Sequence, residues 1–186
     1  MLKPETLNEI SALVRSGFYD KGYLMNIFCE EMYAPGELET KDVSTALDVE
    51  FVKWETEKQT WPDITDCDRL DAAFTAMNER GIIALQNSGY TQNDGYDDFW
   101  EDYENHPDKS SVLGYCFYHG QDLDRAVRGR GLFLAFGPVH PEDEENKGLE
   151  IGNIVCEELE RVGLAVQWDG TFKQRICISK FMWQRR

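Results

Sequence analysis

Long apolar runs are absent from this sequence. No window of its 186 residues approaches the ~18 consecutive apolar residues that a membrane-spanning helix requires. The longest apolar stretches, such as Leu132–Gly137, have the length of a strand. The first ten residues carry Lys3, Glu5 and Glu9 and lack the apolar core of a secretory leader. We therefore expect a cytoplasmic protein that does not associate with membranes.

Basic residues are also scarce. Lys and Arg number 19 against 35 Asp and Glu, which gives a net charge of −16 at neutral pH. A field of this sign repels nucleic-acid phosphates and anionic lipid headgroups, so we expect neither nucleic acid nor a membrane surface as a partner. The acidic balance either serves solubility alone or provides a surface for a basic protein.

The sequence has no CxxC pair and no Cys/His cluster, the spacings typical of redox motifs and structural zinc sites. Its five cysteines are far apart and lie mostly in apolar segments, where free thiols behave as small hydrophobic groups. We therefore predict reduced, mostly buried thiols and no bound metal or cofactor. The cysteines are Cys29, Cys67, Cys116, Cys156 and Cys177.

None of the common catalytic motifs is present. The sequence lacks the GxxxxGK[S/T] and GxGxxG phosphate-binding patterns, the GxSxG nucleophile elbow and the HExxH zinc motif. Arg128–Gly131 contains two glycines but lies between a predicted short helix and a strand, the wrong context for a phosphate loop. The sequence therefore indicates no reaction class and favours a protein that is not an enzyme.

Residues 1–60 have the pattern of a helical N-terminal part. Apolar residues recur at helical spacing over three segments, and Pro35-Gly36 and Trp61-Pro62-Asp63 interrupt them. Thr6, with Glu9 three residues later, matches a capping box at the start of the first helix. The predicted helices cover residues 7–16, 20–33 and 41–58.

From residue 61 onward, short strands alternate irregularly with helices. This order predicts an α+β domain over residues 61–186, with a mixed, largely antiparallel sheet, flanking helices and a C-terminal hairpin. Asp169-Gly170 is a strong turn signal between the last two strands, and the alternation around it places Val166 and Ile176 inward. Helices are predicted at 67–80, 122–128 and 149–162, and strands at 82–86, 112–118, 131–137, 164–168 and 175–179.

The segment 87–109 connects two of these strands and is rich in Asn, Gln, Gly, Tyr and acidic residues. Its ~20 residues far exceed the usual connection of about 4–6. A short helix over 96–104 would place Phe99, Trp100 and Tyr103 on one face. The segment is either a recognition element or a helix that patches the sheet edge. We predict the first, and expect it to be the least rigid and most exposed part of the chain.

Several motifs from Trp61 onward form a distinctive combination. They comprise Trp61-Pro62-Asp63 leading into Asp66–Phe74, then Gly114–Asp122, Gly131–Gly137, and Trp168-Asp169-Gly170 followed by Arg175-Ile176. Together they resemble an uncharacterised bacterial domain of unknown function that is common in actinomycetes, over most of the chain. The resemblance implies no activity. Relatives carry a cysteine cluster after the strand that begins at Ile82, whereas residues 87–94 here contain none, so the resemblance implies no metal site.

Two functional hypotheses follow. The first is a protein-binding module, since mixed polar and aromatic side chains are typical of recognition surfaces. The second is an enzyme of unknown class, with a cleft in which His119 acts as acid or base beside Asp122 and Arg175 holds an anion. Asn87, Tyr90, Trp168 and Asp169 line the same cleft. The hypothesis requires all of these groups to converge, with His119 within ~3 Å of a polar partner. The candidate binding residues are Tyr90, Gln92, Asn93, Tyr96, Trp100, Trp168 and Asp169.

Overall fold

The computed structural model describes residues 1–140, 142 and 146–186, which divide into two compact units. The first comprises Met1–Thr65 with Gln184–Arg186, and the second comprises Asp66–Trp183. These described residues form seven α-helices and one five-stranded sheet, which confirms the α+β class. None of the helices in this part of the chain combines the length and apolar character that a membrane span needs. The domain boundary expected at residue 60 stays a prediction.

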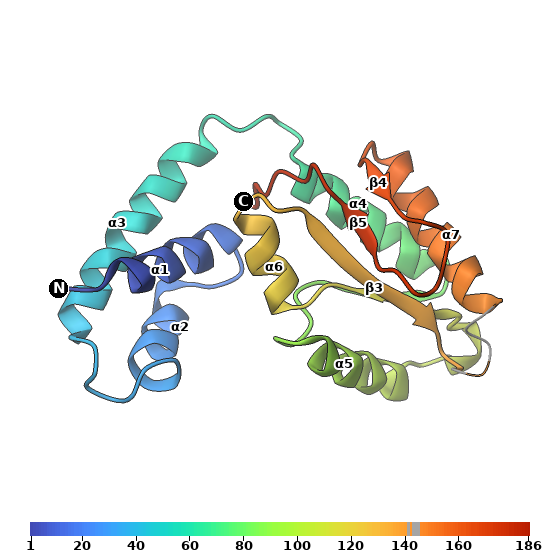
Figure 1. Cartoon of the computed structure of the whole chain (residues 1–186), viewed down its shortest axis with the longest axis horizontal. Helices are drawn as coiled ribbons and strands as arrows, with labels where there is room; N and C mark the ends of the chain where they lie inside the picture. Colours follow the sequence, from blue (N-terminus) through green and yellow to red (C-terminus); the bar gives the residue numbers. More distant parts are fainter. Residues whose placement is uncertain (141, 143–145) are drawn as a thin grey trace. The chain divides into compact units, whose positions relative to one another are not determined.

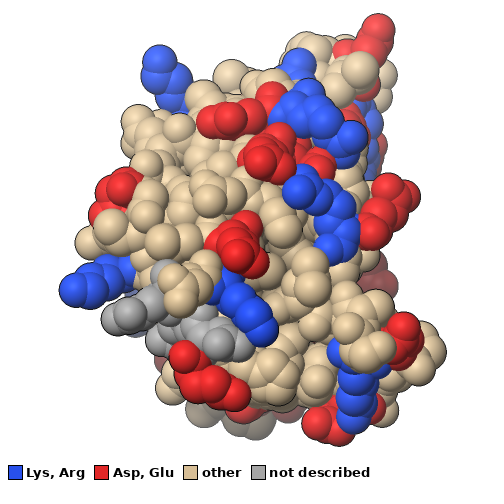
Figure 2. Space-filling model, turned by 90° about the vertical axis from the view of Figure 1, so that its right-hand side faces the viewer, with Lys and Arg blue, Asp and Glu red and all other residues tan. Residues whose placement is uncertain are grey.

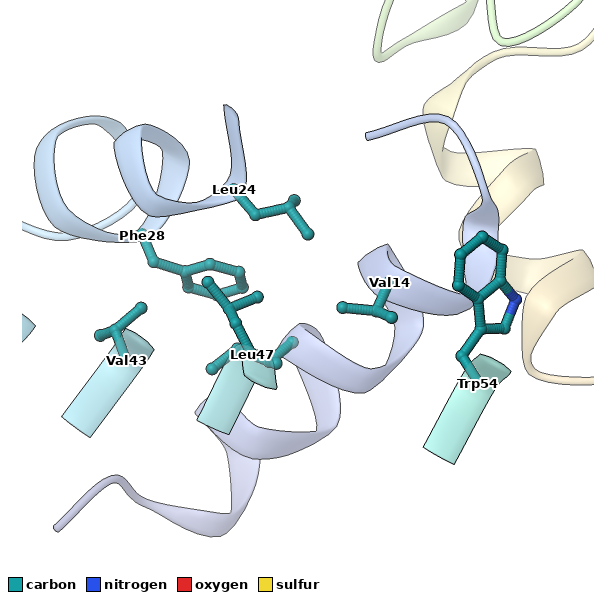
Figure 3. Close-up of a cluster of buried hydrophobic side chains, with 7 residues drawn as sticks. Val14, Leu24, Phe28, Val43, Leu47 and Trp54 are labelled. Carbon is teal, nitrogen blue, oxygen red and sulfur yellow. The ribbon is translucent and has the colours of Figure 1, made fainter. Parts of the chain in front are cut away.

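The first unit is helical and has its own core. Its elements are α1 (Pro4–Ser16), α2 (Lys21–Asn26), a π-helical continuation η1 (Ile27–Glu31) and α3 (Thr40–Lys58). Val14, Leu24 and Phe28 point toward Val43 and Leu47 of α3, and all five are fully buried (Figure 3). The three predicted helices are therefore confirmed, and their apolar stripes meet one another.

The first helix begins earlier than its capping pattern predicts. Pro4 occupies its opening turn and Lys3 is the N-cap, without a side-chain hydrogen bond. Proline suits this position because its fixed φ is helical and no N–H is left without a partner. Thr6 is instead a buried helix residue whose hydroxyl lies 3.0 Å from the Tyr33 hydroxyl. The predicted Thr6–Glu9 capping box is therefore wrong.

The second unit is built on a sheet with the strand order β1-β2-β3-β5-β4, and Figure 1 labels its strands β3, β4 and β5. β1 and β2 are parallel, and the other neighbouring pairs are antiparallel, which confirms a mixed, largely antiparallel sheet. The elements are α4 (Asp66–Glu79), β1 (Ile82–Leu85), α5 (Gln92–Asn105), the 3-10 turn η2 (Lys109–Ser111), β2 (Gly114–Phe117), α6 (Gly120–Val127), β3 (Leu132–Pro138), α7 (Lys147–Arg161), β4 (Val166–Gln167) and β5 (Ile176–Ile178).

Helices cover both faces of this sheet around β2. In Figure 1, α4 and α7 lie on one side of the strands and α5 lies on the other. Successive strand residues point to opposite faces. A Cβ added to Gly114 would lie 3.0 Å from Ile151 in α7, whereas the Phe117 ring lies against Gly95 in α5. All four residues of β2 are buried, because both of its faces are covered.

The C-terminal hairpin is confirmed. Val166 pairs with Ile178 and Gln167 with Cys177, so β4 and β5 are antiparallel on either side of the Asp169-Gly170 turn. Ile176 is fully buried, but Val166 is only half-buried. Its strand is two residues long and lies at the sheet edge, where fewer neighbours cover it.

The segment 87–109 is the crossover of a parallel strand–helix–strand unit. Its helix α5 is longer than predicted and begins at a capping box formed by Thr91 and Asp94. Phe99 is fully buried, with its ring centroid 4.8 Å from that of Tyr115. The prediction of an exposed insert is wrong for this inward side of the helix. Parallel strands need a connection of a dozen or more residues, whereas antiparallel neighbours need only a few.

All five cysteines are free, but only two are buried. Cys67 and Cys116 lie in the core, whereas Cys29, Cys156 and Cys177 are half-buried. The prediction that most would be buried is therefore wrong. In β5 the reason is the two-residue period of a strand, which buries both isoleucines beside Cys177 and turns its thiol to the opposite face.

Candidate functional site

The three predicted catalytic residues meet at the start of α6. His119 is the N-cap of this helix, Asp122 lies in its first turn, and Arg175 directly precedes β5. The Asp122 Oδ2 atom lies 3.0 Å from His119 Nε2 and accepts a hydrogen bond from Arg175 Nη1 at 2.9 Å. Nη1 is also 3.4 Å from Nε2. One carboxylate oxygen thus joins the His119 and Arg175 side chains, so these three members of the predicted cleft meet.

This cluster is closed to solvent except at Arg175. His119 is 4% and Asp122 3% exposed, whereas the Arg175 side chain keeps 35% of its surface. The loop before α5 lies over the cluster, because the backbone N–H of Gly120 donates to the Gly89 carbonyl at 2.9 Å. The Tyr90 ring packs so closely on Gly120 that an added Cβ would lie 2.9 Å from it. Of these three side chains, Arg175 is therefore the one whose guanidinium group can contact a ligand from solvent.

The protonation state of His119 follows from these contacts. Burial lowers the pKa of the imidazole below its usual 6.5; the Arg175 cation lowers this pKa further, while the Asp122 carboxylate partly opposes the shift. The Tyr90 backbone also interacts with the ring and acts on this pKa in the same direction as Asp122. The neutral ring keeps one N–H and one lone pair, and its Nε2 faces both the Asp122 carboxylate and the Arg175 guanidinium. His119 is thus a buried, oriented and neutral imidazole.

Acidification should destabilise the protein through His119. Its folded pKa lies below the unfolded value of 6.5, so its contribution is complete above about pH 6.5 and is lost as the pH falls further. Urea unfolding between pH 7.5 and 5.5 should show a steeper loss for the wild type than for His119→Gln. His140→Gln is the control, since the His140 side chain is 61% exposed. Equal slopes for the wild type and His119→Gln would contradict a neutral buried imidazole.

Of the predicted binding residues on α5 and just before it, some face solvent and others pack against the sheet. Tyr90 is 67% and Trp100 40% exposed, and Asn93 also faces solvent. Tyr96 is half-buried and stands edge-on to the rings of the sheet, with Gln92 Nε2 donating to its hydroxyl at 2.9 Å. The outward set is therefore Tyr90, Asn93 and Trp100, while Tyr96 belongs to the packing of the helix.

The remaining two candidates lie elsewhere. Trp168 contacts Phe136 at right angles, with ring centroids 5.5 Å apart, and packs on Gly152 of α7. The Asp169 carboxylate accepts the backbone N–H of Thr171 within the hairpin turn. Trp168 therefore packs on the α7 side of the sheet, and Asp169 stabilises the turn. The predicted convergence of the whole cleft is wrong, because Trp168 lies on the opposite face of the sheet from His119. Asn87 precedes the loop over His119 and has a positive φ of 50°.

Sequence reasoning missed Phe133 in β3 and Arg125 in α6. The Arg125 and Arg175 guanidinium carbons lie 4.7 and 5.2 Å from the centroid of the Phe133 ring. The sequence could have indicated Arg125, because Arg125 follows Asp122 by three residues and so lies on the same side of α6 as Asp122. The strand pairing that brings Arg175 to the same ring had no local signal.

The chain was compared with known proteins. No curated protein and no solved structure matches it. A family description does match, over residues 2–186 and thus over both units. The chain belongs to the family described as a domain of unknown function, DUF6891.

Proposed function

We propose that this protein is a binding module that docks a basic protein on the outward side of α5. The observation that carries the proposal is Trp100, which is 40% exposed in a helix with six acidic residues and no basic one. Exposed tryptophan and tyrosine are typical anchors of protein interfaces. Tyr90, just before the helix, adds a second exposed ring.

The charges around these rings are available to a partner. Among the described residues, Asp97, Glu101 and Asp102 form no ion pair, whereas Glu104 is paired with Lys109. Figure 2 shows one face of the molecule, on which basic side chains lie among the acidic ones. Carboxylates without a cation close by favour a lysine- or arginine-bearing ligand.

A cavity beside α5 suits such a side chain. It has a volume of about 350 Å³ and lies between the end of β1 and the helix. Asp98, Glu101 and Asp102 line its acidic side, and Leu85 contributes an apolar wall. Lysine and arginine have apolar stems and charged ends, so both parts of the side chain find a complement here.

The proposal is tested by titrating ¹⁵N-labelled protein with a lysine- and arginine-rich peptide. Chemical-shift changes should concentrate on α5 and the loop before it. Asp97→Asn/Glu101→Gln/Asp102→Asn should weaken binding by about tenfold or more, and Trp100→Ala should do so without a change of charge.

A matched triple variant in the first unit controls for overall charge. Glu5→Gln/Glu30→Gln/Asp63→Asn removes the same three charges from exposed positions. Its binding should change little. An equal loss in both triple variants would show a diffuse electrostatic attraction and overturn a docking site on α5.

A catalytic role for His119 is the second candidate, favoured by the carboxylate that holds its ring. Catalysis requires access to the imidazole nitrogens, which the 4% exposure of His119 restricts. Carbethoxylation by diethyl pyrocarbonate measures this access, with the exposed His140 as internal reference. If His140 reacts in the native protein and His119 does not, the catalytic candidate fails.

A further inference from the structure

Two arginines from different elements share one aromatic ring. Arg125 projects from α6 and Arg175 from the strand region before β5, and both guanidinium groups lie within 5.2 Å of the Phe133 centroid. Guanidinium planes stack on aromatic rings, which limits their orientations. Phe133 therefore holds two cations in place on one face of the sheet.

A hydrogen bond to Asp122 also fixes the Arg175 side chain. Its Nη1 donates to Asp122 Oδ2 at 2.9 Å, and Asp122 is held in turn by His119. A guanidinium has five N–H donors, and the contact with Asp122 uses Nη1 alone. The exposed third of the Arg175 side chain thus presents donors to solvent in a fixed direction. His119 and Asp122 act here as positioning residues.

Arg125 keeps its charge available. It is exposed, and its Nε donates to the Arg130 carbonyl at 3.0 Å. Within the part of the chain that the structure describes, no carboxylate forms an ion pair with it. The neighbouring Asp124 is engaged instead by Arg128 at 2.8 Å and Arg130 at 3.7 Å. Although the chain has a net charge of −16, Arg125 thus has no carboxylate counter-ion among the residues that the structure describes.

Cys177 lies at the same place as the two arginines, and they affect the pKa of its thiol. Cys177 pairs with Phe133 in the β3–β5 ladder, so the two side chains are neighbours on one face. Burial raises the pKa of this thiol, and the Arg125 and Arg175 cations oppose the rise. Both guanidinium groups are thus close enough to act on a charge at the Cys177 sulfur.

We propose that Arg125 and Arg175 form a binding site for a small molecule that carries an oxyanion, a phosphate or a carboxylate. Their N–H forks match the oxygen spacing of either group and favour paired, charge-assisted hydrogen bonds. Phe133 and Cys177 form the half-buried floor of the site. The site is separate from the proposed docking surface on α5 and does not depend on it.

Alkylation of Cys177 tests the electrostatic part of the proposal. Iodoacetate is an anion and iodoacetamide is neutral, so the ratio of their rates at this peptide measures the local attraction for an oxyanion. Arg125→Gln should lower the ratio about threefold to tenfold. Arg128→Gln, which removes the same charge at the residue directly after this helix, should leave the ratio nearly unchanged. Equal effects of the two variants would overturn a site at Arg125.

Direct binding is tested with inorganic phosphate and succinate as separate probes. The Nε–Hε resonances of Arg125 and Arg175 should shift saturably with at least one probe, and sodium chloride at equal ionic strength should not reproduce the shift. Saturation by phosphate alone, or by succinate alone, identifies the ligand class. Arg125→Lys keeps the charge but loses the fork, so it should bind more weakly than the wild type. No saturable shift with either probe would overturn the proposal.

Discussion

Replacing Phe99 with alanine should lower the unfolding free energy by about 3–5 kcal/mol, as measured by urea denaturation. The side chain is fully buried between α5 and the sheet, and its ring contacts that of Tyr115. Its removal leaves a cavity that the neighbouring rings cannot fill without moving. Since domains are stable by only about 5–15 kcal/mol, this loss is a large share of the total.

Trp100→Ala is the matched control, because Trp100 is the next residue of the same helix and is 40% exposed. It should change the unfolding free energy by about 1 kcal/mol or less. Deletion of residues 90–104 should prevent folding of the second unit, since it removes the crossover that parallel β1 and β2 require. A Phe99→Ala protein as stable as Trp100→Ala would show that α5 is not part of the core.

Replacing Arg175 with glutamine should destabilise the protein by about 3 kcal/mol. The buried Asp122 carboxylate, 3% exposed, would lose the guanidinium that donates to it. We place the loss at the lower end for a broken buried pair because a third of the Arg175 side chain is already in water. Lys173→Gln, which removes an exposed charge two residues away, should have little effect.

Asp122→Asn/Arg175→Gln should recover most of this stability, because no unpaired charge then stays buried. Free energies of the two single variants and the double variant, from urea unfolding, give the coupling energy. Arg175→Gln alone should also lose less stability at acidic pH. Removing Arg175 raises the pKa of His119, and a protonated imidazole can then neutralise Asp122. Additive losses in the double variant would contradict the shared carboxylate.

Elements with strong local signals were predictable. The Asp169-Gly170 turn specifies the β4–β5 hairpin, since these residues suit the left-handed conformation that Gly170 adopts, with φ at 76°. The first helix shows the limit of such signals. Thr6 has the residue type of a cap, but Pro4 begins the helix upstream and leaves Thr6 inside it.

The relative direction of neighbouring strands was not predictable from the sequence. The wrong prediction for segment 87–109 followed from assuming that the strands on either side of it are antiparallel. The length of the connection looked anomalous for antiparallel neighbours but is normal for the parallel pair β1 and β2. At the candidate site, His119 and Asp122 are close along the chain, so their contact has a local signal. Arg175 reaches them only through the order β2-β3-β5, which no local pattern encodes. Trp168 packs instead on Phe136 and Gly152, on the α7 side of the sheet.

Residues 184–186 belong to the first unit, although the whole second unit precedes them in the chain. The Arg185 guanidinium lies 4.3 Å from the centroid of the Phe18 ring, and Arg186 donates to the Pro62 carbonyl. A nascent chain leaves the ribosome from its N-terminus, so the first unit emerges first but receives its last contacts only after residue 183 has been synthesised. Of these two units, the one made earlier is thus the one completed later, and a fragment ending at residue 65 lacks part of it.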